Sequence, residues 1–280
     1  MSETRTLVLG AIAGMTILLG LPIGRLRRPL PGLRQFLNAL AVGILLFLVW
    51  DVLSHAYEPV DAALSNLHAH KGGLFPVIGY GALFFAGIGV GLVGLVYYER
   101  FLSRRPASLG PGAMSAGELT ARRWGVANWS PARRLALLIA VGIGLHNFGE
   151  GLAIGGSAAR GEIALALLLI IGFGLHNATE GFGVAAPLVG RFVPSWAQIG
   201  VAGLIAGGPT FIGTVVGYQF YSPVLSVFFL ATAVGALVFV IGELWAMLRR
   251  TGLTALVTTT VTLGFLVAFA TEMLIDVSGG

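Results

Sequence analysis

The stretch that decides the fold is GIGLHNFGEG at residues 142–151, which returns as GFGLHNATEG at residues 172–181. Seven of the ten positions are identical in the two copies, at an offset of thirty residues. Each copy lies about midway along an apolar run that is long enough to cross a membrane as a helix. Because consecutive membrane helices run antiparallel, the repetition predicts the same groups at the same depth from opposite directions, as in an inverted repeat around a midplane site.

The composition of the whole chain also indicates a membrane protein. Of its 280 residues, 56% are hydrophobic and 10% are charged, and the mean hydropathy is +0.89. Soluble domains carry about 25% charged residues, so this composition excludes a soluble globular domain and a disordered chain. We predict an all-α integral membrane protein, an inverted-repeat bundle of eight transmembrane helices at residues 6–24, 35–57, 74–98, 134–158, 163–190, 196–220, 223–247 and 253–275.

The basic residues are distributed unevenly between the two sides of this bundle. Loops after the odd-numbered spans hold 14 of the 17 lysines and arginines, and the opposite side keeps Arg5, Lys71 and Arg160. Because basic loops stay in the cytoplasm, we expect both termini outside, in a multi-pass protein of the plasma or inner membrane. The net charge of +5 then reflects topology and contact with anionic lipids, and we expect no nucleic-acid partner.

One connection is much longer than the others. Residues 99–133 mix proline, glycine and serine with arginine, a composition typical of a linker. We predict a single membrane domain in which residues 1–98 form the first three spans, residues 99–133 a cytoplasmic linker loop, and residues 134–280 the last five spans.

The two repeated motifs carry ionisable side chains, which are costly inside a membrane and functional by default. His146 and Glu150 are spaced i and i+4 and share one helix face, with Asn147 about 100° round. Together with the second copy, they offer imidazole, carboxylate and amide ligands suited to Zn²⁺, Fe²⁺, Mn²⁺ or Cd²⁺. A buried polar network with protonated carboxylates and a metal-free proton relay remain alternatives. The second copy supplies the same three groups from His176, Asn177 and Glu180.

Further polar residues lie toward the outer end of the second span. Asp51 and His55 are again i and i+4, and we interpret them as part of a funnel that collects cations. A solvated helix end is the alternative for this region, although Asp51 follows a long apolar run and lies inside the hydrocarbon. In the outward loop we expect four more polar residues, Glu58, Asp61, His68 and His70.

Two other acidic positions lie near helix ends. Glu243, near the inner end of the seventh span, is a candidate for passing metal to the cytoplasm, or else it pairs with Arg249 or Arg250. Glu272 and Asp276, at the outer end of the eighth span, are expected to form a solvated terminus.

The paired His-Asn-x-x-Glu-Gly motifs, on the fourth and fifth of eight spans, resemble the ZIP (Zrt/Irt-like) family of divalent metal transporters. Weaker similarities extend along the chain: residues 41–58 resemble the family's second span, Gly217 after Pro209 the sixth, and residues 233–243 the seventh. The resemblance implies uptake of a transition metal into the cytoplasm through a mononuclear or binuclear site on the fourth and fifth spans.

The sequence departs from the family's pattern in three places. Gly149 precedes Glu150 where the family often has proline, so we expect a smaller kink. Gly208 precedes Pro209 where related bacterial members have glutamate, which removes a carboxylate from the second metal site. The loop at residues 99–133, commonly rich in histidine in the family, has none.

We therefore expect a transporter rather than an enzyme, with Zn²⁺ or a similar divalent cation as the transported substrate and no organic cofactor. Expected partners are divalent metal ions, membrane lipids and a second copy of the chain in a homodimer. The alternative is a membrane-embedded zinc metallohydrolase, in which bound Zn²⁺ activates water. The sequence has no H-E-x-x-H pair, the helical signature of many zinc hydrolases, and its ligand face is symmetric across two helices.

Overall fold

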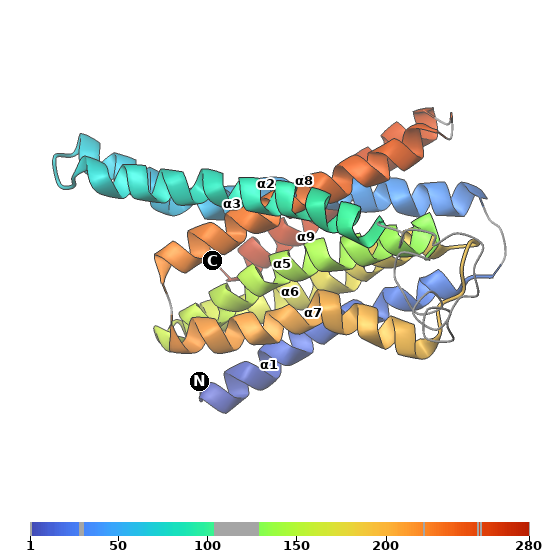
Figure 1. Ribbon diagram of the computed structural model, residues 1–280. Helices are drawn as coiled ribbons and strands as arrows, with labels where there is room; N and C mark the ends of the chain where they lie inside the picture. Colours follow the sequence, from blue (N-terminus) through green and yellow to red (C-terminus); the bar gives the residue numbers. More distant parts are fainter. Residues whose placement is uncertain are drawn as a thin grey trace, which may run out of the picture.

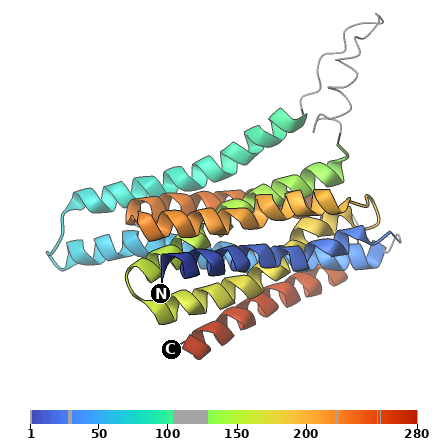
Figure 2. The same cartoon turned by 90° about the horizontal axis from the view of Figure 1, so that it is seen from below.

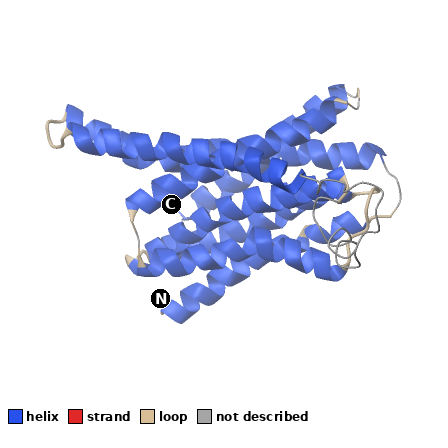
Figure 3. Cartoon of the chain, in the orientation of Figure 1, coloured by secondary structure: helices blue, strands red, loops and turns tan. Residues whose placement is uncertain are grey.

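A computed structural model of the chain describes residues 2–27, 31–103, 129–220, 222–250, 252 and 254–279, with the backbone alone at residues 31, 102–103, 165, 176 and 274–279. Every regular element in these ranges is a helix (Figure 3). Eight of the described helical segments are long and apolar enough to cross a membrane. The predicted all-helical fold is therefore confirmed, and the described helices that could cross a membrane are eight in number, as the sequence predicts.

The helix ends follow local sequence signals. α7 begins with a capping box, in which Ser195 and Gln198 each bond the other's backbone N–H. α5 and α8 have proline in the first turn, where a missing N–H costs nothing. In chain order the α-helices are α1 Glu3–Met15, α2 Pro31–His68, α3 Leu74–Ser103, α5 Pro131–Ala159, α6 Ile163–Ala185, α7 Trp196–Gln219, α8 Pro223–Arg249 and α9 Thr254–Gly279, with 3-10 turns η1 Thr16–Leu19, η2 Leu21–Arg25 and η4 Ala186–Leu188.

Most bounds lie within a few residues of the predicted ones. The first span is α1 continued by η1 and η2, because Pro22 cannot continue an α-helix. The predicted linker is shorter than residues 99–133 at both ends, since α3 runs to Ser103 and α5 begins at Pro131. The rest of that linker, residues 104–128, lies outside the described residues.

The largest difference is at the end of α2, which we expected to stop near residue 57. The helix continues through Pro59 to His68, so the expectation that Glu58, Asp61 and His68 lie in a loop is wrong. Its 38 residues span about 57 Å, well beyond the ~30 Å of hydrocarbon. Its polar last turns are tolerated because α2 and α3 project past the other helices (Figure 1).

The extension of α2 is held by packing against its neighbours. Ala56 and Val60 on α2 form one buried cluster with Phe84 of α3 and Val227 of α8. This apolar contact explains why the helix survives a proline that removes one of its hydrogen bonds. Of the four polar residues expected in the outward loop, only His70 lies in the turn between α2 and α3.

The helices pack as two groups. α1, α5, α6 and α7 contact one another, with α5 against α7 as the most extensive pair. α2, α3, α8 and α9 form the second group through the pairs α3–α8, α2–α9 and α2–α8, and α5 meets α8 between the groups. α1 begins and α9 ends at the same end of the bundle (Figure 2), as an even number of crossings requires. We call this end the termini end.

Close helix pairs within each group depend on glycine. A β-carbon at Gly213 of α7 would collide with the backbone oxygen of Phe148 on α5, and one at Gly91 of α3 would collide with that of Thr232 on α8. Small residues allow this approach of membrane helices. Between the groups, a β-carbon at Gly149 would instead meet only the side chain of Leu230.

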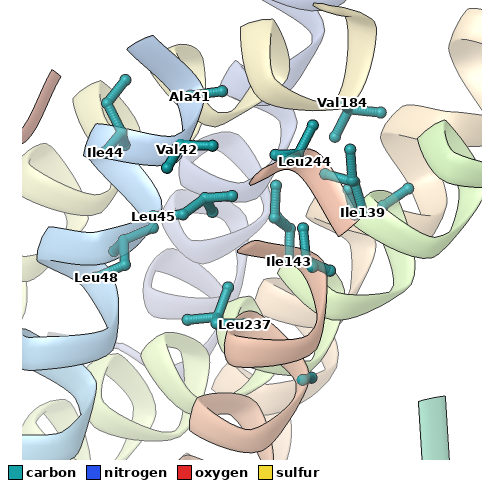
Figure 4. Packing of buried hydrophobic residues seen from close by; sticks show 14 of the residues in the cluster. Ala41, Val42, Ile44, Leu45, Leu48, Ile139, Ile143, Val184, Leu237 and Leu244 are labelled. Carbon is teal, nitrogen blue, oxygen red and sulfur yellow. The ribbon is translucent and has the colours of Figure 1, made fainter. Parts of the chain in front are cut away.

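The apolar core fills the space between the two groups (Figure 4). Leu45 and Leu48 of α2 face Ile143 of α5 and Leu237 and Leu244 of α8, and all five are at most 2% exposed. We call these five residues the apolar layer. On α5 it lies one turn before His146, so it adjoins the repeated motif.

Candidate metal site

The repeated motifs bring three ionisable side chains into contact between α5 and α6. Nε2 of His146 lies 3.2 Å from Oε1 of Glu150, one turn along α5. The same nitrogen lies 3.7 Å from Oε1 of Glu180 on α6. All three residues are buried, with no more than 4% of their surface exposed. The helical spacing in the sequence predicts the first contact, and the packing of α5 on α6 supplies the second.

Both asparagines of the motifs are fixed by neighbouring helices. Nδ2 of Asn147 donates a hydrogen bond to the backbone oxygen of Ala206 on α7 at 2.9 Å. Nδ2 of Asn177 donates to the backbone oxygen of Ala13 on α1 at 3.1 Å. Each Oδ1 atom is buried and accepts no hydrogen bond from the described residues. These oxygens are therefore left available for a ligand.

The two motifs also interleave. Asn177 of α6 lies beside the carboxylate of Glu150 on α5, and Asn147 of α5 lies beside that of Glu180 on α6. Each asparagine is thus a neighbour of the carboxylate from the other copy of the motif. The structure therefore brings together five of the six predicted ligand residues, although it contains no described group of three or more His, Asp or Glu that is arranged to hold a metal ion.

The sixth predicted ligand, His176, lies on α6 next to Asn177. Its side chain is outside the described part of the structure. A role for His176 as a ligand stays a prediction.

A cavity of about 290 Å³ reaches this site from the termini end. His146 and Glu150 line its inner part, and the predicted Asp51 and His55 line it on α2. Nδ1 of His55 lies 3.6 Å from Oδ1 of Asp51. The charge of Asp51 acts on both His146 and Glu150, so the α2 carboxylate faces the repeated motif across the cavity.

One cation, Arg160, also lines this cavity. It donates two hydrogen bonds to Glu162, from Nε at 3.1 Å and from a terminal nitrogen at 2.9 Å. These bonds hold the pKa of the exposed Glu162 carboxyl below its usual value. Acidic groups outnumber this one cation, because four carboxyl groups line the same cavity, those of Asp51, Glu58, Glu150 and Glu272.

Sequence reasoning missed one residue of this cavity. Glu272 of α9, expected in a solvated terminus, is half-buried and lines the cavity with Asp51. It reaches there because α9 packs along α2, a contact that no local pattern in the sequence reveals. The companion residue Asp276 has a side chain outside the described part of the structure.

Glu243 does not belong to this cavity. It lies near the end of α8 and lines a separate cavity at the opposite end of the bundle. No described arginine lies within 4.0 Å of its carboxylate, so the structure shows no salt bridge to Arg249 or Arg250, although the charge of Arg250 acts on this carboxylate. On α8, Leu237 of the apolar layer comes six residues before Glu243, on the side of the site, and Leu244 follows Glu243 directly.

Comparison with known proteins adds no assignment. No protein-family model matches the chain, and no curated protein sequence matches it either. The chemistry of the site therefore carries the functional argument.

Proposed function

We propose that this chain is a transporter that moves a divalent transition-metal cation across the membrane into the cytoplasm. Zn²⁺ is the first candidate, and Fe²⁺, Mn²⁺ and Cd²⁺ are the others. The observation that carries the proposal is the buried meeting of His146, Glu150 and Glu180 from two copies of one motif. Two carboxylates and an imidazole in a buried site are costly without a partner, and a dication would offset their charge.

The distances at this site support a small cation. Ligand atoms about 2.0–2.1 Å from a tetrahedral Zn²⁺ are about 3.3 Å apart. The separations of 3.2 and 3.7 Å around Nε2 of His146 are close to that value. The free Oδ1 atoms of Asn147 and Asn177 would complete the shell, and His176 would add a second imidazole.

The surroundings of the site support one direction of access. The cavity from the termini end supplies carboxylates from Asp51 and Glu272 along the approach, which would attract cations. Toward the opposite end, the apolar layer separates the site from Glu243. Passage of the cation would therefore require this layer to open, after which Glu243 could receive the metal on its way to the cytoplasm.

We further propose that the chain belongs to the ZIP family and forms a homodimer in the cell membrane. The cross-wise contacts of the two asparagines support an inverted repeat centred on α5 and α6. The charge split of 14 to 3 supports external termini and a cytoplasmic linker at residues 99–133. With the termini outside, the cavity described above is the external one.

The orientation can be tested because the chain has no cysteine. In intact cells, a membrane-impermeant thiol reagent is expected to label Ser2→Cys and to spare Ser115→Cys. Both positions should react after the cells are lysed, which controls for local accessibility. Labelling of Ser115→Cys in intact cells with Ser2→Cys protected would reverse the orientation.

Transport itself is tested with the purified chain in liposomes that enclose a zinc-sensitive dye. We expect Zn²⁺ uptake that other borderline divalent cations inhibit in competition and that does not require ATP, since the sequence has no P-loop motif. Hydrolysis of lipid or peptide bonds in detergent, with no uptake in liposomes, would instead favour the metallohydrolase.

The pH dependence of binding has a defined sign. Metal ligation requires neutral imidazole and ionised carboxylate, so protons compete with the cation for His146, Glu150 and Glu180. An ordinary histidine takes up its proton near pH ~6.5. Zn²⁺ affinity is therefore expected to fall as pH is lowered from about 7 to about 5, with protons released when metal binds. Calorimetric titration in buffers of different ionisation enthalpy measures both the affinity and the proton release. An affinity that does not change across this pH range would contradict the proposal.

A further inference from the structure

A second polar cavity, of about 480 Å³, lies at the end of the bundle opposite the termini end. It is enclosed by the first turns of α2 and α5, the segment after α6, and the last turns of α3 and α8. Its volume is in the range of small-molecule sites. The charged side chains that line it are four arginines and two glutamates: Arg34, Arg134, Arg191, Arg250, Glu99 and Glu243.

The charged groups of this cavity leave it positive, since four arginines face two glutamates and, among the described arginines, only the charge of Arg250 acts on Glu243. No described arginine lies within 4.0 Å of the carboxylate of Glu99 or Glu243. Arg34 instead faces the like charge of Arg191. A basic side is expected to hold many arginines by the positive-inside rule, but that rule does not require guanidinium groups from four parts of the chain to meet in one cavity.

Helix dipoles add to the positive potential. α2 and α5 both open onto the cavity with their N-terminal ends, and neither has an acidic residue in its first turn. A helix N-terminus carries partial positive charge and is stabilised by anions, not by cations such as Arg34. An anion between these two helix ends would be stabilised by both dipoles and by the arginines.

The wall of the cavity also holds hydrogen-bond acceptors. Nδ2 of Asn38 donates to the backbone oxygen of Arg34 at 2.8 Å, which fixes the amide. Oδ1 of Asn38 and Oε1 of Gln35 are buried and have no hydrogen-bond partner among the described residues. Buried acceptors are nearly always satisfied, so a ligand that brings hydroxyl donors would complete them.

We propose that this cavity binds a phosphate ester that carries free hydroxyl groups. Arg34, Arg191 and Arg250 would hold the phosphate, since guanidinium groups donate paired hydrogen bonds to phosphate oxygens. Gln35 and Asn38 would accept from the hydroxyls. This chemistry is shared by the glycerol headgroup of an anionic phospholipid and by a soluble polyol phosphate. The proposal does not depend on the transported substrate.

The test uses the full chain, purified in a neutral detergent, and binding calorimetry with four probes. These are dihexanoyl phosphatidylglycerol, dihexanoyl phosphatidylcholine, glycerol 3-phosphate and inorganic phosphate. We expect dihexanoyl phosphatidylglycerol to bind. The choline lipid lacks net charge and hydroxyls, so we expect it not to bind. Arg34→Gln with Arg191→Gln should weaken binding at least about tenfold, as expected when charge-assisted hydrogen bonds are lost.

The matched control is Arg27→Gln with Arg249→Gln, which removes the same charge from exposed positions outside the cavity and should bind as the unaltered chain does. If the cavity double variant does not fold, as judged by thermal unfolding, the exposed Arg250→Gln replaces it. Tighter binding of glycerol 3-phosphate than of the glycerol lipid, with the same dependence on the variants, would assign the site to a soluble phosphate. No binding of either ester, or equal losses in the two double variants, would overturn the proposal.

Discussion

Replacing Glu150 and Glu180 together with alanine is expected to abolish high-affinity Zn²⁺ binding by the purified chain. Both carboxylates are buried and lie against Nε2 of His146. Losing one buried charged partner costs about 3 kcal/mol, which corresponds to about 100-fold in affinity. Each single variant should therefore weaken binding about 100-fold, and the double variant should bind no Zn²⁺ in the micromolar range by calorimetry.

The matched control is Glu3→Ala, which removes an exposed carboxylate at the start of α1. It should leave Zn²⁺ affinity unchanged, since this carboxylate accepts a hydrogen bond from Gln219 and lines neither the site nor its cavity. Unchanged affinity in the double variant would show that the metal, if any, binds elsewhere on the chain.

The substitution Gly213→Ala, which adds a single methyl group, is expected to destabilise the protein strongly and to weaken metal binding as well. The new β-carbon would meet the backbone oxygen of Phe148 and the backbone nitrogen of Leu152 on α5. Backbone atoms cannot move aside as a side-chain tip can, so α5 would have to shift along with His146 and Glu150. Overpacking of this kind typically costs about 1–3 kcal/mol.

Gly208→Ala, on the same helix, is the control, because nothing lies within 4 Å of its added β-carbon. Alanine is the better helix former, by about 0.5–1 kcal/mol, so this variant should be as stable as the parent or more so. Thermal unfolding in detergent, followed by circular dichroism, compares the two. Equal unfolding temperatures for both variants would contradict the close packing of α5 on α7.

The sequence predicted the helices well because hydrophobic length and charge are local properties. All eight spans were found, and the one large error, at Pro59, arose because packing of Val60 on Phe84 outweighs the local penalty of proline. Spacing along a helix likewise predicted the contact of His146 with Glu150.

Contacts between distant segments were harder to predict. That Asn147 and Asn177 bond backbone oxygens of α7 and α1 depends on which helices become neighbours. Glu272 joins the cavity of Asp51 for the same reason. The gathering of arginines at the opposite end is also a tertiary feature, since Arg34 and Arg191 are far apart in the sequence.

The most direct test of the central claim is anomalous X-ray diffraction at the zinc edge on crystals of the full chain grown with Zn²⁺. The two copies of the motif should produce an anomalous peak between α5 and α6, about 2.0–2.2 Å from Nε2 of His146 and from an oxygen of Glu150 and of Glu180. The side chain of His176 should be visible at the same peak if it is a ligand. A chain that binds Zn²⁺ in solution but shows its anomalous peak only at Asp51 and His55, or at no buried site, would contradict the account.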